Sequence, residues 1–211
     1  MRFAKEAWPF VLPPAIVGVA LVALDKTSIG IATIVLALLL LLFFRVPNRP
    51  VNADDETVLA PANGRITRVD IIEDSSIGVG RFHRIVTFLS VFDIHVQRAP
   101  VSGRVVKSEF FAGKKVAAFR EDAGVLNEQV LTVVKRPNDD LVAIRQIAGL
   151  VARRVVTYLK KHQDISKGDL IGVIKFGSRV DLLLPESYEV QVEVGMRITE
   201  GETIVALQGD K

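Results

Sequence analysis

The chain has 211 residues, 49% of them hydrophobic, and a formal net charge of +3. It contains no cysteine, which excludes disulfides, thiolate metal sites and a cysteine nucleophile. Three histidines give poor support to a multi-histidine metal site, so we expect no metal. The mild charge and the few aromatic residues are equally poor support for nucleic-acid binding, and we expect no nucleic-acid partner.

Two apolar segments open the chain, Ala7–Leu24 and Thr27–Phe44, and neither contains a charged residue. As a helix each would be about 27 Å long, just short of the roughly 30 Å hydrocarbon core of a bilayer. Only Asp25-Lys26 separates them. The pattern predicts a transmembrane helical hairpin within residues 1–44, with helices near 7–24 and 27–44.

Basic residues flank this hairpin on both sides: Arg2 and Lys5 come before it, and Arg45 and Arg49 come after it. By the positive-inside rule both ends face the cytoplasm, so we expect an inner cell membrane protein whose remaining residues lie on the cytoplasmic side. A secretory signal peptide fits poorly, because two apolar segments occur and neither precedes a small-residue cleavage site. A re-entrant or interfacial helix pair stays open, since three prolines interrupt the first segment.

Residues 45–57 are predicted to form a Pro-rich, charged linker, and residues 58–211 a single β-rich domain. Short runs of valine and isoleucine separated by turn residues follow from Val58 onward, and apolar and polar residues alternate in Val190–Val194. Gly149–Lys161 is the best helical candidate, but its β-branched residues suit a strand equally well. We therefore expect a mainly β domain with few helices.

Two pairs of phrases repeat within this domain. Pro61–Ile66 resembles Pro100–Val105, and Ile165–Ile171 resembles Ile198–Ile204. Such Gly-centred hairpins recur in the barrel-sandwich folds of lipoyl and biotinyl domains, so we expect a barrel-sandwich-like architecture. The lysine that a lipoyl or biotinyl carrier presents at a hairpin tip is missing, which leaves a structural β-sandwich adaptor as the non-catalytic interpretation.

The motif that carries chemistry is Lys175-Phe-Gly-Ser-Arg-Val-Asp-Leu-Leu-Leu-Pro185. On its own, a Gly-Ser pair between two apolar strands is typical of an ordinary turn. Three further blocks accompany it: APANG (Ala60–Gly64), FLSVFDIHVQRAPVSG (Phe88–Gly103) and QIAGLVARRVV (Gln146–Val156). In this order and spacing the four blocks resemble the phosphatidylserine decarboxylase family, specifically its short bacterial and archaeal branch. The resemblance covers residues 45–211, and an N-terminal hydrophobic hairpin is usual in that branch.

The resemblance implies that the chain cuts itself between Gly177 and Ser178. The Ser178 hydroxyl attacks the Gly177 carbonyl, which glycine leaves accessible. Elimination and loss of ammonia then give a covalent pyruvoyl group on a small chain, 178–211, paired with a large chain, 1–177. This group would form a Schiff base with phosphatidylserine in the bilayer and accept electrons as CO2 leaves, so that phosphatidylethanolamine is the product.

His95 matches the histidine of the family's Asp-x-His motif, here Asp93-Ile94-His95. The resemblance implies that it is the acid that reprotonates the product. Many members carry a second histidine three residues later, where this chain has Arg98, and arginine cannot act as a general base. One histidine would then serve both self-cleavage and turnover. Arg98 is either a ligand of the lipid phosphate or a plain surface charge. We expect His83 and His162 to lie on the surface.

The family's Pro-Ala-Asp-Gly motif reads Pro61-Ala-Asn-Gly64 in this chain. The family's aspartate is taken to orient and charge-stabilise the histidine that activates the serine. Asn63 keeps the hydrogen bond but supplies no charge, and in serine hydrolases the comparable change costs about ten-thousand-fold in rate. Two hypotheses stay open: a pyruvoyl-dependent decarboxylase, and a non-catalytic membrane-anchored β-sandwich protein that stays uncut because of Asn63. A homodimer through edge strands is a further open prediction.

Overall fold

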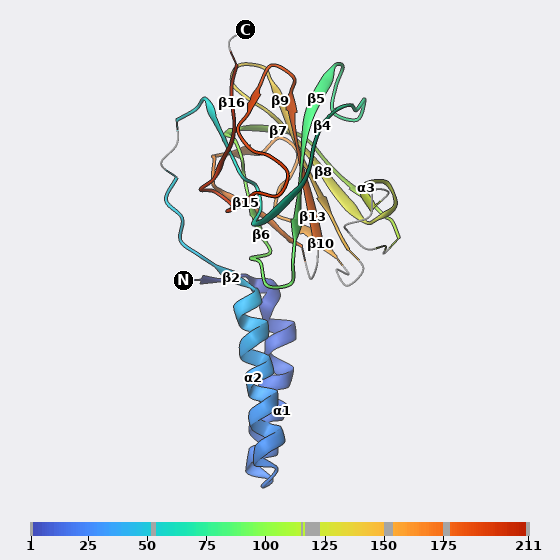
Figure 1. Cartoon of the computed structure of the whole chain (residues 1–211). Coiled ribbons are helices and arrows are strands. Elements are labelled where there is room, and N and C mark those ends of the chain that lie inside the picture. The colour runs from blue at the N-terminus through green and yellow to red at the C-terminus, as the bar shows by residue number, and fades with distance from the viewer. Residues whose placement is uncertain are drawn as a thin grey trace. The chain divides into compact units, whose positions relative to one another are not determined.

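The structure is a computed structural model of the chain (Figure 1) that describes residues 2–51, 54–114, 116, 123–149, 154–174 and 178–209. It divides into two compact units, Met1–Asn48 and Arg49–Lys211. Gly177 and part of the block Gln146–Val156 lie outside the described residues.

The first unit contains the two helices that the sequence predicts. A short 3-10 turn, η1 (Lys5–Ala7), leads into α1 (Trp8–Ala23), and α2 (Thr27–Phe43) returns. The two-residue strands β1 (Arg2–Phe3) and β2 (Arg45–Val46) pair with each other, so both ends of the hairpin lie side by side. By length and composition the helical stretch Lys5–Ala23 could cross a membrane, and Thr27–Phe43 is a shorter apolar helix.

Two glycines allow α1 and α2 to pack closely. A Cβ atom at Gly18 would lie 2.9 Å from the backbone oxygen of Gly30, and one at Gly30 would lie 2.7 Å from the oxygen of Gly18. Small residues at such a crossing are typical of helix pairs whose backbones touch, as in membrane helix dimers. The predicted helical hairpin is therefore confirmed as a helix pair.

The second unit is mainly β, as predicted, and its strands pair antiparallel (Figure 1). An eight-stranded sheet has the order β11-β7-β8-β9-β13-β5-β4-β15, and two three-stranded sheets have the orders β10-β12-β6 and β14-β16-β3. The narrower expectation of a barrel-sandwich-like architecture stays a prediction. The bounds of the strands, and of one short helix in the described part of this unit, are β3 (Thr57–Leu59), β4 (Gly64–Glu73), β5 (Arg81–Leu89), β6 (Val96–Arg98), β7 (Gly103–Phe111), α3 (Ala123–Leu126), β8 (Gln129–Lys135), β9 (Leu141–Ile147), β10 (Val155–Thr157), β11 (Asp164–Ile165), β12 (Leu170–Ile174), β13 (Ser178–Pro185), β14 (Glu189–Val190), β15 (Arg197–Ile198) and β16 (Ile204–Leu207).

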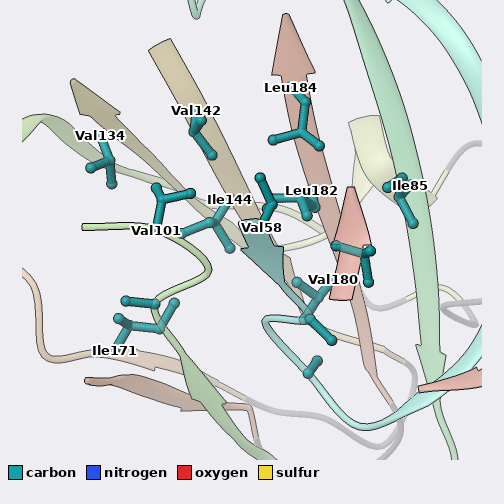
Figure 2. Close-up of a cluster of buried hydrophobic side chains, with 14 of the residues drawn as sticks. Val58, Ile85, Val101, Val134, Val142, Ile144, Ile171, Val180, Leu182 and Leu184 are labelled. Carbon is teal, nitrogen blue, oxygen red and sulfur yellow. The ribbon is translucent and has the colours of Figure 1, made fainter. Parts of the chain in front are cut away.

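Strand β13 shows how the alternating pattern builds the core. Val180, Leu182 and Leu184 point into the main cluster of buried aliphatic side chains, which Figure 2 shows together with residues from β5, β8, β9 and β12. Leu183 packs into a second, smaller cluster. Because successive side chains of a strand point to opposite faces, Ser178 shares the inward face of Val180.

The repeated phrases of the sequence adopt repeated structures. Gly64 and Gly103 begin strands β4 and β7, and they pair with Ile198 and Ile165 at equivalent places. Gly201 and Gly168 occupy the two matching turns, both with positive φ. Their N–H groups donate to the backbone oxygens of Ala60 and Ala99, the residues directly before the two Pro-containing phrases, at 2.9 and 2.8 Å. The similarity seen in the sequence is therefore confirmed at the level of backbone contacts.

The ambiguous segment Gly149–Lys161 contains a strand. Val155–Thr157 forms β10, in which Val156 pairs with Val173 of β12. Its β-branched residues suit this pairing, and residues 150–153 lie outside the described part.

Candidate active site

Ser178 is the first residue of strand β13. Its backbone pairs with Leu89 at the end of β5, and the next residue pairs with Ile147 at the end of β9. The side chain is 0% exposed, and its Oγ makes no hydrogen bond to any residue in the described part of the chain. A buried hydroxyl without a partner costs on the order of 1–3 kcal/mol, so its retention here calls for a functional explanation.

His95 is buried directly before strand β6. Its Nδ1 atom lies 2.8 Å from the backbone oxygen of Asp93. Because a carbonyl oxygen only accepts hydrogen bonds, Nδ1 carries the proton and Nε2 is the basic nitrogen. The imidazole is therefore held in the tautomer that a general base requires, and a backbone carbonyl holds it there.

The side chain of Asp93 braces the turn that carries His95. Its Oδ2 atom accepts hydrogen bonds from the N–H and the hydroxyl of Ser90, both at 2.8 Å. Its Oδ1 atom accepts one from the guanidinium of Arg197 in β15. The Asp-x-His motif therefore acts as a unit, because the carboxylate stabilises the turn and the backbone oxygen orients the imidazole.

Two connections between sheets bring Ser178 and His95 to the same end of the domain. Residues 90–95 lead from β5 to β6, and β12 leads through residues 175–177 to β13. β5 pairs with β13, with Leu89 opposite Ser178, while β6 pairs with β12 in the smaller sheet. The N–H of Ile174 also donates to the backbone oxygen of His95 at 3.1 Å. The ends of both connections are therefore adjacent.

Asn63 lies on the other side of β5 from Ser178. The following Gly64 packs so closely against β5 that a Cβ atom would lie 2.2 Å from the oxygen of Phe88, which requires glycine. With strands about 4.8 Å apart, the backbone at Gly64 lies about 10 Å from Ser178. The Oδ1 atom of Asn63 accepts a hydrogen bond from the N–H of Glu200 at 3.2 Å, and its Nδ2 has no partner among the described residues.

Glu200 is a buried carboxylate that our sequence analysis missed. Its side chain is 0% exposed, and its Oε1 atom lies 3.0 Å from Nε of Arg49 and 4.0 Å from Nε of Arg98. Burial raises the pKa of Glu200, and the two guanidinium groups act in the opposite direction. In the sequence it belongs to a Gly-centred repeat, and nothing there separates it from the exposed Glu202.

Arg98 is buried, with 8% of its surface exposed, so it is not a plain surface charge. One terminal nitrogen donates to the backbone oxygen of Gly168 at 2.8 Å, and Nε faces Glu200. Burial is the main cause that lowers the pKa of Arg98. These contacts are with protein groups, and a role in phosphate binding stays a prediction.

The other two histidines lie elsewhere. His83 in the upstream half of β5 is partly exposed, with Nε2 3.1 Å from the oxygen of Glu186, and His162 is exposed in a turn. Among the residues that the structure describes, no group of three or more His, Cys, Asp or Glu side chains is placed to hold a metal ion.

The arrangement supports proton transfer coupled to nucleophilic attack. The buried Ser178 and the buried His95 lie at the ends of two adjacent connections, and the buried Asn63, which accepts a hydrogen bond from the N–H of Glu200, lies on the other side of β5. Of the predicted site residues, Gly177 alone lies outside the described part.

The chain is similar to known proteins over most of its length. A family model described as phosphatidylserine decarboxylase matches residues 36–206. The chain is 39% identical over 204 residues to the phosphatidylserine decarboxylase proenzyme of Cupriavidus pinatubonensis, covering 96% of this chain and 94% of the relative. Identity to the protein of the same name from Symbiobacterium thermophilum is 37% over 203 residues, with 96% and 94% covered. For Amoebophilus asiaticus it is 39% over 181 residues, covering 85% of this chain and 80% of the relative.

Proposed function

The chain belongs to the phosphatidylserine decarboxylase family, and we propose that it is a membrane-bound enzyme that converts phosphatidylserine to phosphatidylethanolamine and CO2. The observation that carries the proposal is the buried hydroxyl of Ser178, which has no hydrogen-bond partner among the described residues and lies beside the turn that holds His95. The relatives are named proenzymes, which supports a chain that is processed before it acts.

Self-cleavage needs only groups that the chain provides. Nε2 of His95 takes the proton of the Ser178 hydroxyl while Oγ attacks the carbonyl carbon of Gly177. The C–N bond then breaks as the same proton passes from His95 to the nitrogen, so the acyl group moves from nitrogen to oxygen and Ser178 gains a free amino group. Loss of the Cα proton and cleavage of the Cβ–O bond release residues 1–177 with a new carboxylate and leave a dehydroalanine. Water then replaces its nitrogen, ammonia departs, and the small chain 178–211 begins with a pyruvoyl group.

When formed, the pyruvoyl group supplies an electron sink for decarboxylation. It would be held at the start of β13, between β5 and β9, whose backbone pairing keeps the small chain in the sheet after the cut. His95 then has a second task, which is to deliver a proton to the carbon that has lost CO2.

Asn63 is compatible with this function because His95 does not depend on residue 63 for its tautomer. The large cost of an Asp-to-Asn change in serine hydrolases comes mostly from the wrong tautomer. Here the backbone oxygen of Asp93 accepts the Nδ1 proton. What remains is the missing negative charge beside an imidazolium, and a reaction that occurs once per molecule tolerates the slower rate.

The helical hairpin of the first unit would insert into the bilayer in which the substrate lies. Pairing of Arg2 with Val46 and of Phe3 with Arg45 supports an arrangement with both basic ends on one side of the membrane. By the positive-inside rule this side is the cytoplasmic face of the inner membrane.

Reconstitution into vesicles that contain phosphatidylserine tests the function. We expect the full chain to form phosphatidylethanolamine and release CO2, and the Ser178→Ala chain to form none. Equal product from both chains, or none from either, contradicts the proposal. The second result would support the alternative, a non-catalytic membrane-anchored β-sandwich protein, which Asn63 favours. A homodimer through edge strands stays a prediction.

A further inference from the structure

The turn between β5 and β6 exposes two large apolar side chains. Val91 is 49% exposed and Phe92 is 87% exposed, directly after Ser90 and before the buried Ile94 and His95. A single exposed aromatic residue is ordinary on a protein surface. Its position between the two candidate catalytic segments makes this one informative.

The turn is braced and holds Phe92 out in water. The N–H of Asp93 donates to the oxygen of Ser90 at 3.0 Å, and Ser90 returns two hydrogen bonds to the Asp93 carboxylate. Arg197 ties the same carboxylate to β15. The exposure of the ring is therefore a property of a fixed backbone conformation.

Two arginines lie behind this turn on neighbouring strands. Arg197 of β15 pairs directly with Arg65 of β4, and Arg65 in turn pairs with Phe88 of β5. Both side chains are exposed. Arg197 shares its charge with the carboxylate of Asp93, and a terminal nitrogen of Arg65 donates to the backbone oxygen of Gly195 at 2.8 Å, so of the two guanidinium groups only that of Arg197 has a carboxylate partner among the described residues. The preceding turn adds the exposed Val194 and Met196, with Glu193 as its one acidic residue.

We propose that Val91 and Phe92, with Arg65, Arg197 and Met196, form a docking patch for the surface of an anionic bilayer. The apolar side chains enter the membrane interface, and the basic side chains add electrostatic attraction to anionic lipids. The inference rests on the proposed function for its purpose: Leu89, which pairs with Ser178, and His95 flank the turn, so docking brings the site to the lipid headgroups.

The absence of cysteine makes a direct test clean. Phe92→Cys, labelled with the environment-sensitive dye NBD, is compared with labelled Val79→Cys, whose fully exposed side chain lies in the turn at the other end of β5. Both are made in the full chain with Ser178→Ala, so that the substrate is not consumed. In vesicles of phosphatidylglycerol and phosphatidylcholine we expect a blue shift and quenching by doxyl-labelled lipid at position 92 only. Equal spectra at the two positions would overturn the proposal.

A blue shift at position 92 that appears in detergent and rises with protein concentration would assign the patch to a second copy of the chain, and would also overturn it. Arg65→Gln should weaken the quenching at position 92 in anionic vesicles and leave it unchanged in pure phosphatidylcholine. Because the label needs no catalysis, the outcomes separate. If the label inserts but the natural chain forms no phosphatidylethanolamine, the docking patch is supported and the proposed function is contradicted. If phosphatidylethanolamine forms but the label does not insert, only the docking patch is contradicted.

Activity provides a second measurement. For Phe92→Ser we expect about a tenfold rise in KM for phosphatidylserine in vesicles, because a large apolar side chain no longer enters the interface. The kcat, and the activity on a short-chain substrate dispersed in detergent, should not change. An equal loss on both substrates would contradict docking.

Discussion

Strand β5 has a turn at each end, and the two turns are stabilised in the same way but have different surroundings. Each turn is braced by an aspartate that accepts hydrogen bonds from a serine of its own turn and from an arginine of another strand, Asp74 upstream and Asp93 downstream. Each also exposes a large apolar side chain, Val79 and Phe92. The turn design alone therefore does not distinguish a structural end from a functional one.

The difference lies in what is buried behind each turn. Upstream, the chain ends a simple β4–β5 hairpin; its Asp74–Arg145 ion pair is partly exposed and the neighbouring Arg81–Glu186 pair is exposed. Downstream, the chain crosses to another sheet, and His95, Ser178 and Glu200 are buried there. Buried polar groups cost free energy, so their concentration at one end of the strand indicates where function has been retained.

Replacing one histidine near each end of β5 should give the largest difference, which we expect in the rate of self-cleavage. His95→Gln is expected to slow self-cleavage by about 10²–10⁴-fold, since it removes the general base. His83→Gln, on the upstream half of the same strand, should leave the rate unchanged. Time courses of fragment formation after cell-free synthesis measure both, and equal rates for the two variants would contradict the role of His95.

Replacing one carboxylate near each end of β5 should lower the free energy of unfolding by different amounts. Glu200→Ala removes the acceptor of the Arg49 hydrogen bond, leaves Arg49 and Arg98 without their buried partner and opens a cavity, so we expect a loss of about 3 kcal/mol in the free energy of unfolding at neutral pH. Glu186→Ala breaks only the exposed pair with Arg81, for which about 1 kcal/mol is the upper limit. Denaturant titration in detergent tests this, and similar losses would refute the contrast.

Restoring a charge at residue 63 should act on the downstream end alone. Asn63→Asp places a negative charge on the side of β5 opposite Ser178, and we expect self-cleavage to become about ten- to hundredfold faster because an imidazolium is stabilised. Asn138→Asp, the same change in the turn between β8 and β9, is the control. An unchanged or slower rate for Asn63→Asp would show that the charge is not what the site lacks.

The smallest effect concerns Asp70 in β4. Its hydrogen bond with Arg84 is the main cause that holds the pKa of Asp70 below its usual 3.8. Asp70 therefore binds a proton more readily in the unfolded chain than in the native one. The contribution of its ionised carboxylate to the free energy of unfolding is complete above pH 3.8 and is lost as the pH falls through the lower native pKa. Because the pair is partly exposed, we expect Asp70→Asn to cost no more than about 1 kcal/mol at pH 7.

The pH dependence of unfolding checks this sign. The stability difference between the natural chain and Asp70→Asn should shrink below pH 3.8, and a difference that grows there would contradict it. Burial acts in the opposite direction on Glu200, whose raised pKa reduces stability as the pH rises between its unfolded and native values.

Much of the fold was accessible from the sequence because local patterns determine it. Charge-free apolar segments predicted the helix pair, and the two repeated Gly-Arg phrases adopt equivalent structures at Gly64 and Gly103. Val155–Thr157 was ambiguous, because its strand depends on pairing with β12, a partner distant in the sequence.

The site was only partly predictable. Ser178, His95 and Asn63 came from the resemblance to a family, and the structure places all three around β5. No residue pattern could predict that the backbone carbonyl of Asp93 orients His95, because every residue has such a carbonyl. The burial of Glu200 and of Arg98 follows from packing between strand β6 and the turn after β15, which are far apart in the sequence, and no local pattern records such a contact.

The central claim is that Ser178 becomes the reactive group, and intact mass spectrometry of the purified full chain tests it most directly. We expect two species from the natural chain, residues 1–177 ending in a carboxylate and residues 178–211 beginning with a pyruvoyl group, and a single full-length species from Ser178→Ala. A single uncut species from both the natural chain and Asn63→Asp would contradict it.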